Sequence, residues 1–241
     1  MHRLPVTRPT NIIIFLFLIL GAAATPSLAH DLWLEEENGD YVLYQGHRHS
    51  NHAGDDRVAY EPEIVKAITC ADPEGVRRSI DPPTTYPARI AGPCAALHVL
   101  TSTGYWTRTT QGLRNQPRSA LTGTIRSWES RQGIKRLNTW SPALAAPLSD
   151  ALEITSLADP AALTPGSPLR LLITLAGQPQ EGVAVTRDGE FQGMSDAAGQ
   201  VSIRLEASGL RFLGARFEEP RADGLADATV HAATLMLELP E

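Results

Sequence analysis

The sequence predicts an all-β chain, with an N-terminal β-rich domain at residues 30–147 and a β-sandwich domain at residues 148–241. Short runs of β-branched or alternating residues recur between turn signals, and long segments of helical period are scarce. At "SPALAAPLSD", proline and alanine replace a mixture of aromatic residues and arginines. This change of composition marks the boundary between the two predicted domains.

Residues 1–29 have the pattern of an export signal. Arg3 and Arg8 precede the apolar run "IIIFLFLILGAAA", which is too short to span a bilayer comfortably, and small residues follow it. Cleavage after Ala29 is expected, which makes His30 the first residue of a periplasmic protein. Its formal charge is then 19 minus 27, or −8, against −6 for the whole chain. This acidic balance excludes a basic nucleic-acid-binding protein, and no later segment is apolar enough to cross a membrane.

The N-terminal domain is expected to begin with a hairpin. In "DLWLEEENGDYVLYQG", strands at Leu32–Glu36 and Tyr41–Gln45 flank the turn "NGD". Further strands are predicted at "EIVKAITC", "CAALHVLTS" and "GYWTRTT". For residues 119–140 the sequence leaves two alternatives, a helix and a long bent strand. Gly123 and Gly133 favour the strand.

Charged and aromatic side chains of this region are assigned to ordinary structural roles. A solvated face is expected for the four basic residues Arg126, Arg131, Lys135 and Arg136. Core and interdomain packing is expected for the dispersed aromatic residues Tyr105, Trp106, Trp128 and Trp140.

The C-terminal domain shows at least four strand candidates at short intervals, punctuated by "AGQPQEG", "RDGE" and "DAAGQ". The final "ATVHAATLMLEL" is predicted to return as a closing strand. The segments "GQPQEGVAV" and "SDAAGQVSIRL" resemble the immunoglobulin-like or transthyretin-like modules of exported bacterial proteins. That resemblance implies an immunoglobulin-like β-sandwich.

The two cysteines, Cys70 and Cys94, fit an oxidising compartment. One bridge between them would close a loop worth roughly 3 kcal/mol in the chain-entropy account. The alternative is a pair of unpaired buried thiols.

Four of the seven histidines lie between residues 30 and 52 and suggest a metal site. An N-terminal His30 offers its α-amino group and its imidazole to one cation. His47 and His49 face the same side of an extended backbone, and the hairpin returns them toward the terminus. This nitrogen-rich set suits Ni, Co, Cu or Zn better than Mg or Ca.

The remaining histidines are weaker candidates. His52 is separated from the pair by loop residues of unknown geometry, and its role is open between ligand and support. His98 lies in an apolar run and is expected to be a core histidine. For His231 the sequence leaves two alternatives, metal ligand and structural residue. It is a ligand if the closing strand packs toward the first domain.

The opening "AHDLWLEEENGDYVLYQGHRHSNH" resembles that of the DUF4198 family, exported proteins that begin H-D-x-W-L and continue to a G-H-x-H element. The segments "GYWTRTTQG", "SWESRQGIKR" and "HAATL" are similar to later parts of that family. Some members are associated with nickel and cobalt ABC or energy-coupling uptake systems as periplasmic components. The resemblance implies transition-metal handling at His30, His47 and His49, and also at His231.

The leading hypothesis is a periplasmic protein without enzymatic activity that binds nickel or cobalt and presents it to the membrane component of such a transporter. No nucleophile motif or phosphate loop argues for another chemistry. Two alternatives remain: a copper histidine-brace oxidative enzyme, and a non-catalytic β-sandwich module of the envelope.

Overall fold

The computed structural model describes residues 31–46, 57–164, 166–205 and 208–239. These residues contain no α-helix, which confirms the all-β prediction. Their helical segments are four short 3-10 turns, η1 (Pro62–Ile64), η2 (Arg118–Ala120), η3 (Pro142–Leu144) and η4 (Pro160–Ala162). None of the helical segments described is long and apolar enough to cross a membrane.

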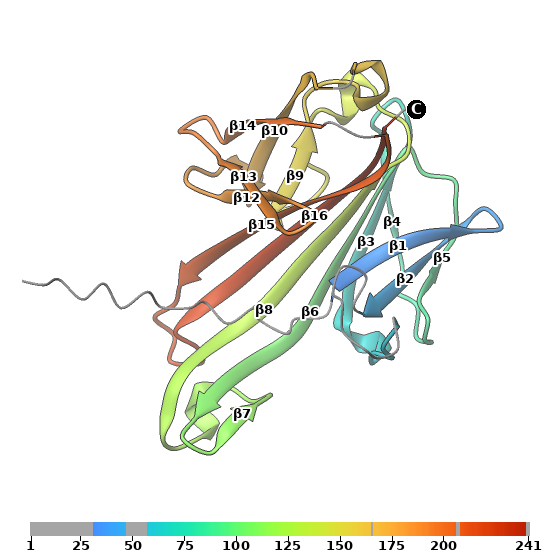
Figure 1. Cartoon of the computed structure of the whole chain (residues 1–241). Helices are drawn as coiled ribbons and strands as arrows, with labels where there is room; N and C mark the ends of the chain where they lie inside the picture. The colour runs from blue at the N-terminus through green and yellow to red at the C-terminus, as the bar shows by residue number, and fades with distance from the viewer. Residues whose placement is uncertain (1–30, 47–56, 165, 206–207, 240–241) are drawn as a thin grey trace, which may run out of the picture.

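The described strands form three sheets, a long, twisted central sheet and two smaller ones (Figure 1). The central sheet has nine strands: β3 (Val65–Ala71), β4 (Arg77–Ile80), β6 (Ala96–Thr109), β7 (Gly112–Arg114), β8 (Thr124–Leu137), β12 (Ala184–Arg187), β13 (Glu190–Met194), β15 (Gly209–Pro220) and β16 (Ala228–Leu239). A three-stranded sheet contains β1 (Asp31–Glu37), β2 (Asp40–Gly46) and β5 (Arg89–Ile90). A four-stranded sheet contains β9 (Glu153–Ser156), β10 (Pro168–Leu175), β11 (Gln178–Pro179) and β14 (Gln200–Arg204).

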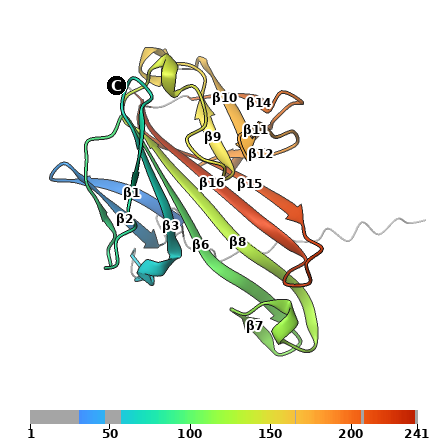
Figure 2. The ribbon, with the colours of Figure 1, turned by 180° about the vertical axis from the view of Figure 1, so that it is seen from behind.

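The middle part of the central sheet buries both of its faces, because each smaller sheet covers one of them (Figure 2). Successive side chains of a strand point to opposite faces. Along β16, Leu235 and Leu237 accordingly join the core shared with the four-stranded sheet. Met236, between them, joins the core shared with the β1–β2 hairpin. One sheet therefore carries a core on each side.

The predicted N-terminal hairpin is confirmed. β1 pairs with β2 from Asp31↔Gly46 to Glu37↔Asp40 without a register shift. Its turn residues Asn38 and Gly39 have φ values of 56° and 86°. Such left-handed conformations belong to a type I′ turn, for which Asn-Gly is a preferred pair.

The segment left open between helix and strand is strand β8, which pairs with β6 over most of its length. The glycine at 133 suits this strand for a physical reason. A Cβ built there would lie 2.8 Å from His98 Nε2 and 3.1 Å from the carbonyl oxygen of Leu152. The missing side chain leaves room for the segment leading into β9 to cross the sheet closely.

The predicted β-sandwich is also confirmed, since β9, β10 and β14 pack against β12, β15 and β16 around a common apolar core. The closing strand is β16, which pairs with β15 on one side and in parallel with β8 on the other. Strands from both sides of the predicted boundary after residue 147 thus share one sheet. The division into two domains stays a prediction.

A disulfide joins Cys70 and Cys94, which confirms the first of the two alternatives for these cysteines. Cys70 lies in β3, and Cys94 lies just before β6, the strand with which β3 pairs. Both residues are buried in the core beneath the hairpin. The bridge closes a loop of 24 residues, for which the chain-entropy account gives about 3 kcal/mol.

One expectation about charge is wrong: Lys135 does not lie on a solvated face. Its side chain is 2% exposed, and its Nζ donates to Glu153 Oε1 at 2.8 Å and to Thr155 Oγ1 at 3.2 Å. Glu153 Oε2 accepts from the backbone N–H groups of Leu148 and Ser149. Burial alone would raise the pKa of Glu153, but the Lys135 ammonium and these hydrogen bonds outweigh it and lower that pKa.

Candidate functional site

Three backbone segments meet at the open end of the β1–β2 hairpin, which we define by Asp31, Gly46 and Arg57. Asp31 is paired with Gly46, and Gly46 is bridged to Arg57. The backbone N–H of Val58 donates to the carbonyl oxygen of Gln45 at 2.7 Å. The chain therefore leaves this point at residue 46 and is back beside it at residue 57.

The predicted ligands His30, His47, His49 and His52 lie outside the described residues. The structure describes only the residues that flank them, and these are the residues of the open end. Their role as metal ligands stays a prediction.

Arg57 is fixed at the open end by two contacts. Its Nη2 donates to Glu35 Oε2 at 2.8 Å, and its guanidinium carbon lies 3.7 Å from the centre of the Tyr44 ring. The other oxygen of Glu35 accepts from the indole N–H of Trp33 at 2.7 Å. An ion pair combined with a cation–π contact holds the end of β2 and the returning chain together.

Beside this end, Tyr44 donates its hydroxyl to Glu37 Oε1 at 2.5 Å, and Arg89 donates to Glu37 Oε2 at 2.9 Å. The hydrogen bond from Tyr44, followed by that from Arg89, lowers the pKa of Glu37. The same hydrogen bond to Glu37 raises the pKa of the Tyr44 phenol. Tyr44 thus stays neutral and ordered under the guanidinium of Arg57.

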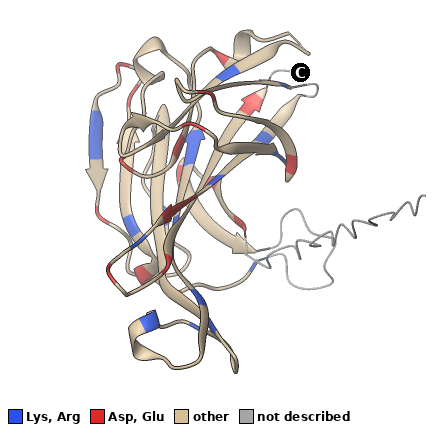
Figure 3. Cartoon of the chain, turned by 90° about the vertical axis from the view of Figure 1, so that its left-hand side faces the viewer, with Lys and Arg blue, Asp and Glu red and all other residues tan. Residues whose placement is uncertain are grey.

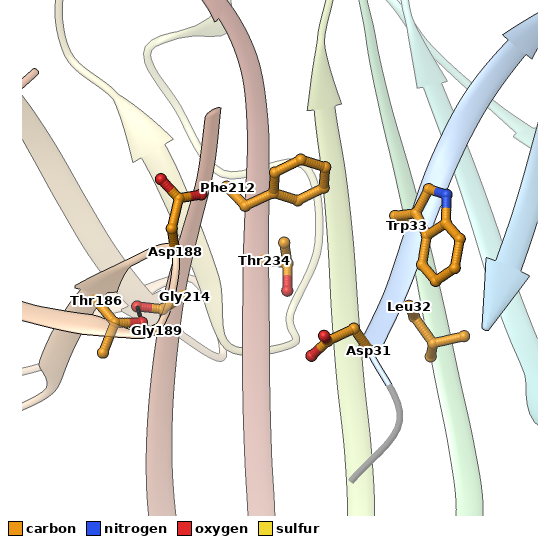
Figure 4. A pocket seen from close by; sticks show the side chains of 9 residues that line it. All are labelled: Asp31, Leu32, Trp33, Thr186, Asp188, Gly189, Phe212, Gly214 and Thr234. Atoms are coloured by element: carbon orange, nitrogen blue, oxygen red, sulfur yellow. Dashed lines mark hydrogen bonds between the residues drawn. The ribbon is translucent and has the colours of Figure 1, made fainter. Parts of the chain in front are cut away.

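A pocket of about 150 Å³ lies next to the open end (Figure 4). The first residues of β1 form one wall, and the β12–β13 turn forms the opposite wall. β15 and β16 lie between them. Its lining comprises Asp31, Leu32, Trp33, Thr186, Asp188, Gly189, Phe212, Gly214 and Thr234. Most of the lining surface is apolar, and two carboxylates and two threonine hydroxyls also line the pocket.

The structure does not bring His231 to this end. His231 is two residues before Ala233 on β16, so its side chain points to the same face of the central sheet as those of Ala233 and Leu235. That face packs against the four-stranded sheet. Thr234 lines the pocket and Met236 contacts β1, and both side chains point to the opposite face of the central sheet. His231 is 5% exposed, and its Nε2 lies 3.3 Å from Glu219 Oε2. Burial lowers its pKa, against the effect of Glu219.

His98 is a buried core histidine, as expected. It is 2% exposed, and its Nε2 lies 3.2 Å from the hydroxyl of Ser149, which itself donates to Glu153. Burial lowers the pKa of His98. The residue belongs to the polar network of Lys135 and Glu153, which the sequence had not suggested.

Among residues 31–46, 57–164, 166–205 and 208–239, no three His, Cys, Asp or Glu side chains gather as a metal site requires. A single buried hydroxyl in these ranges, that of Thr174, is without a hydrogen-bond partner.

No protein-family model matches the chain, and no curated protein matches it. Among solved structures, it is similar to the four N-terminal Ig domains of Dscam1 isoform 1.9, with 14% identity and a TM-score of 0.22. The match covers 72% of this chain and 37% of the other, so the chain spans little more than a third of it.

The chain is also similar to the fibronectin(III)-like modules of CbhA from Clostridium thermocellum, with 11% identity and a TM-score of 0.22. That match covers 87% of this chain and 95% of the other. Such low TM-scores carry no argument about function. The β-sandwich rests on the strand pairing and the shared core described above.

Proposed function

We propose that this chain binds a divalent transition-metal ion, nickel or cobalt, in the periplasm and delivers it to the membrane component of an uptake system. The proposed ligands are the imidazoles of His30, His47 and His49, with the α-amino group of His30. His52 is proposed as a supporting residue. The protein acts as a carrier of its metal and needs no catalytic step.

The convergence at the open end of the hairpin carries this proposal. His30 is one peptide bond from Asp31, and His47 is one peptide bond from Gly46. Directly paired residues of an antiparallel ladder have Cα atoms about 4.5–5.5 Å apart, and consecutive Cα atoms are about 3.8 Å apart. These spacings are short enough for both imidazoles to bind one metal ion, which bonds imidazole nitrogen at about 2 Å.

The chemistry of the donors supports a transition metal. Imidazole and amine nitrogens suit Ni, Co, Cu and Zn, whereas Mg and Ca require oxygen ligands. The supply of metal in the compartment and the coordination geometry then decide which ion is carried. The resemblance of the opening segment to the DUF4198 family favours nickel or cobalt within this group.

The proposal is tested on the exported protein isolated from the periplasm. Native mass spectrometry should show a first residue at His30 and one bound nickel or cobalt ion. Titration against a competing chelator should give one tight site. A different first residue, or no tight site, would contradict the proposal. Reduction of dioxygen or peroxide with a reductant would support the copper-enzyme alternative instead.

Arg57→Ala should weaken nickel binding by about tenfold, the cost typical of losing a residue that orients metal ligands. The substitution removes the two side-chain contacts of Arg57 at the open end and leaves the backbone bridge to Gly46 in place. Arg89→Ala is the matched control, since it breaks a similarly exposed ion pair with Glu37. Surface pairs contribute at most about 1 kcal/mol, so the two variants should unfold at similar temperatures. Equal nickel affinity in both variants would show that Arg57 does not organise the site.

A further inference from the structure

The paired strands β6 and β8 continue past their neighbours and project from the body of the molecule (Figures 1 and 2). The pairing of β3 with β6 ends at Thr101, and the pairing of β16 with β8 ends at Trp128. We call residues 104–128 the arm, which holds the outer parts of β6 and β8 with β7 and η2 between them.

The arm is basic although the chain is acidic. It contains four arginines and no acidic residue, within a stretch from residue 82 to residue 128 that lacks Asp and Glu entirely. Since the whole chain has a formal charge of −6, the residues outside the arm sum to −10 once the +4 of the arm is removed. Figure 3 shows this end of the molecule, at the bottom of the view, with blue segments only.

Two of the four arginines are neutralised by carboxylates outside the arm. Arg118 pairs with Asp227, and Arg126 pairs with Glu218. Arg108 and Arg114 are exposed and have no carboxylate partner among the described residues. Their charge is therefore available to an anion outside the protein.

Exposed apolar side chains accompany these arginines. Leu113 is 45% exposed, and its register partner on β6 is Arg108, so the two lie on the same face of the sheet. Ile125 is 61% exposed at the register shift between β6 and β8. One row inward, Trp106 and Trp128 are directly paired and half-buried. Core and interdomain packing was expected for these residues, and the register instead places the two side by side on the arm.

The arm is held in one conformation by its own hydrogen bonds. The Asp227 carboxylate accepts from Arg118 and from the backbone N–H of Ser127 at 2.7 Å. The Thr107 hydroxyl donates to the carbonyl oxygen of Gln116 at 2.8 Å. Because the surface is preorganised, binding through it costs little conformational entropy.

We infer that the arm attaches the protein to an anionic phospholipid surface. Arginines near such a surface are attracted to its negative potential, tryptophan favours the interface, and aliphatic side chains insert below the headgroups. A soluble polyanion would use the arginines but gains nothing from exposed Leu113 and Ile125. The inference does not depend on the metal site, although attachment would bring a carrier close to a membrane partner.

Co-sedimentation of the full exported chain with vesicles tests this inference. Binding to phosphatidylcholine vesicles containing phosphatidylglycerol should exceed binding to pure phosphatidylcholine by roughly tenfold or more, and should weaken with added salt. Arg108→Glu with Arg114→Glu should remove that difference. Leu113→Ser with Ile125→Ser should weaken binding several-fold at constant charge.

The matched control is Arg77→Glu with Arg170→Glu, which changes the net charge equally at exposed positions outside the arm. It should retain most of the binding. Equal binding by the control and the arm variant, or no preference for anionic vesicles, would overturn the inference. Binding to a soluble polyuronate without retention on anionic vesicles would overturn it as well.

Discussion

Lys135→Met is expected to destabilise the protein by about 3–5 kcal/mol, the cost typical of removing one partner from a buried ion pair. Lys135 and Glu153 are 2% and 1% exposed, so no water replaces the lost ammonium. The Glu153 carboxylate keeps its backbone hydrogen bonds from Leu148 and Ser149 but loses its counter-ion. Denaturant unfolding of the two proteins at pH 7 measures the difference.

The pH dependence of this effect follows from the pKa of Glu153. In the wild type that pKa is lowered in the folded state, so its contribution to stability is present above the unfolded pKa and is lost as pH falls through the folded pKa. Without the ammonium, burial raises the pKa of Glu153 in the variant, and protonation then favours its folded state. The difference in free energy of unfolding between the wild type and Lys135→Met should therefore decrease as the pH is lowered.

Lys66→Met is the matched control, because Lys66 is exposed and its ammonium donates to the carbonyl oxygen of Glu63. Exposed substitutions of this kind change the free energy of unfolding by about 0.5 kcal/mol or less. A Lys135→Met protein as stable as this control would show that the ion pair contributes nothing to the fold.

The local features of the fold could be predicted from sequence because they depend on neighbouring residues. Asn38 and Gly39 fix a two-residue turn, and short apolar runs on both sides form the strands that it joins. For Cys70 and Cys94, the sequence left undecided only whether the disulfide forms.

The features that were missed depend on residues far apart in the chain. Lys135 was assigned to solvent because its partner Glu153 comes from a strand in another layer. The sharing of one sheet by both predicted domains results from the parallel pairing of β16 with β8. Neither contact leaves a periodic signal within its own segment.

The candidate site shows the same division. The hairpin register that gathers Asp31 and Gly46 was predictable, whereas the bridge from Gly46 to Arg57 was not. The side of the sheet faced by His231 depends on the register of β16 within a nine-stranded sheet. Sequence alone therefore left its role open, and the structure separates it from the hairpin.

His47→Ala with His49→Ala should reduce the affinity for nickel by at least about 100-fold. Losing a residue that merely orients a ligand already costs about 10- to 100-fold, and this variant removes two proposed ligands. Isothermal titration with Ni(II), with circular dichroism to verify the fold, makes the measurement.

His231→Ala separates a local site from a general effect of removing histidine. Its side chain lies on the face of the central sheet opposite to β1, so nickel affinity should stay within about twofold of the wild type. Binding by the wild type should weaken on acidification, because protons compete with the metal for imidazole nitrogens. If the double variant kept wild-type affinity while His231→Ala lost it, the metal would be held at β16 and the proposed ligands at the hairpin would be wrong.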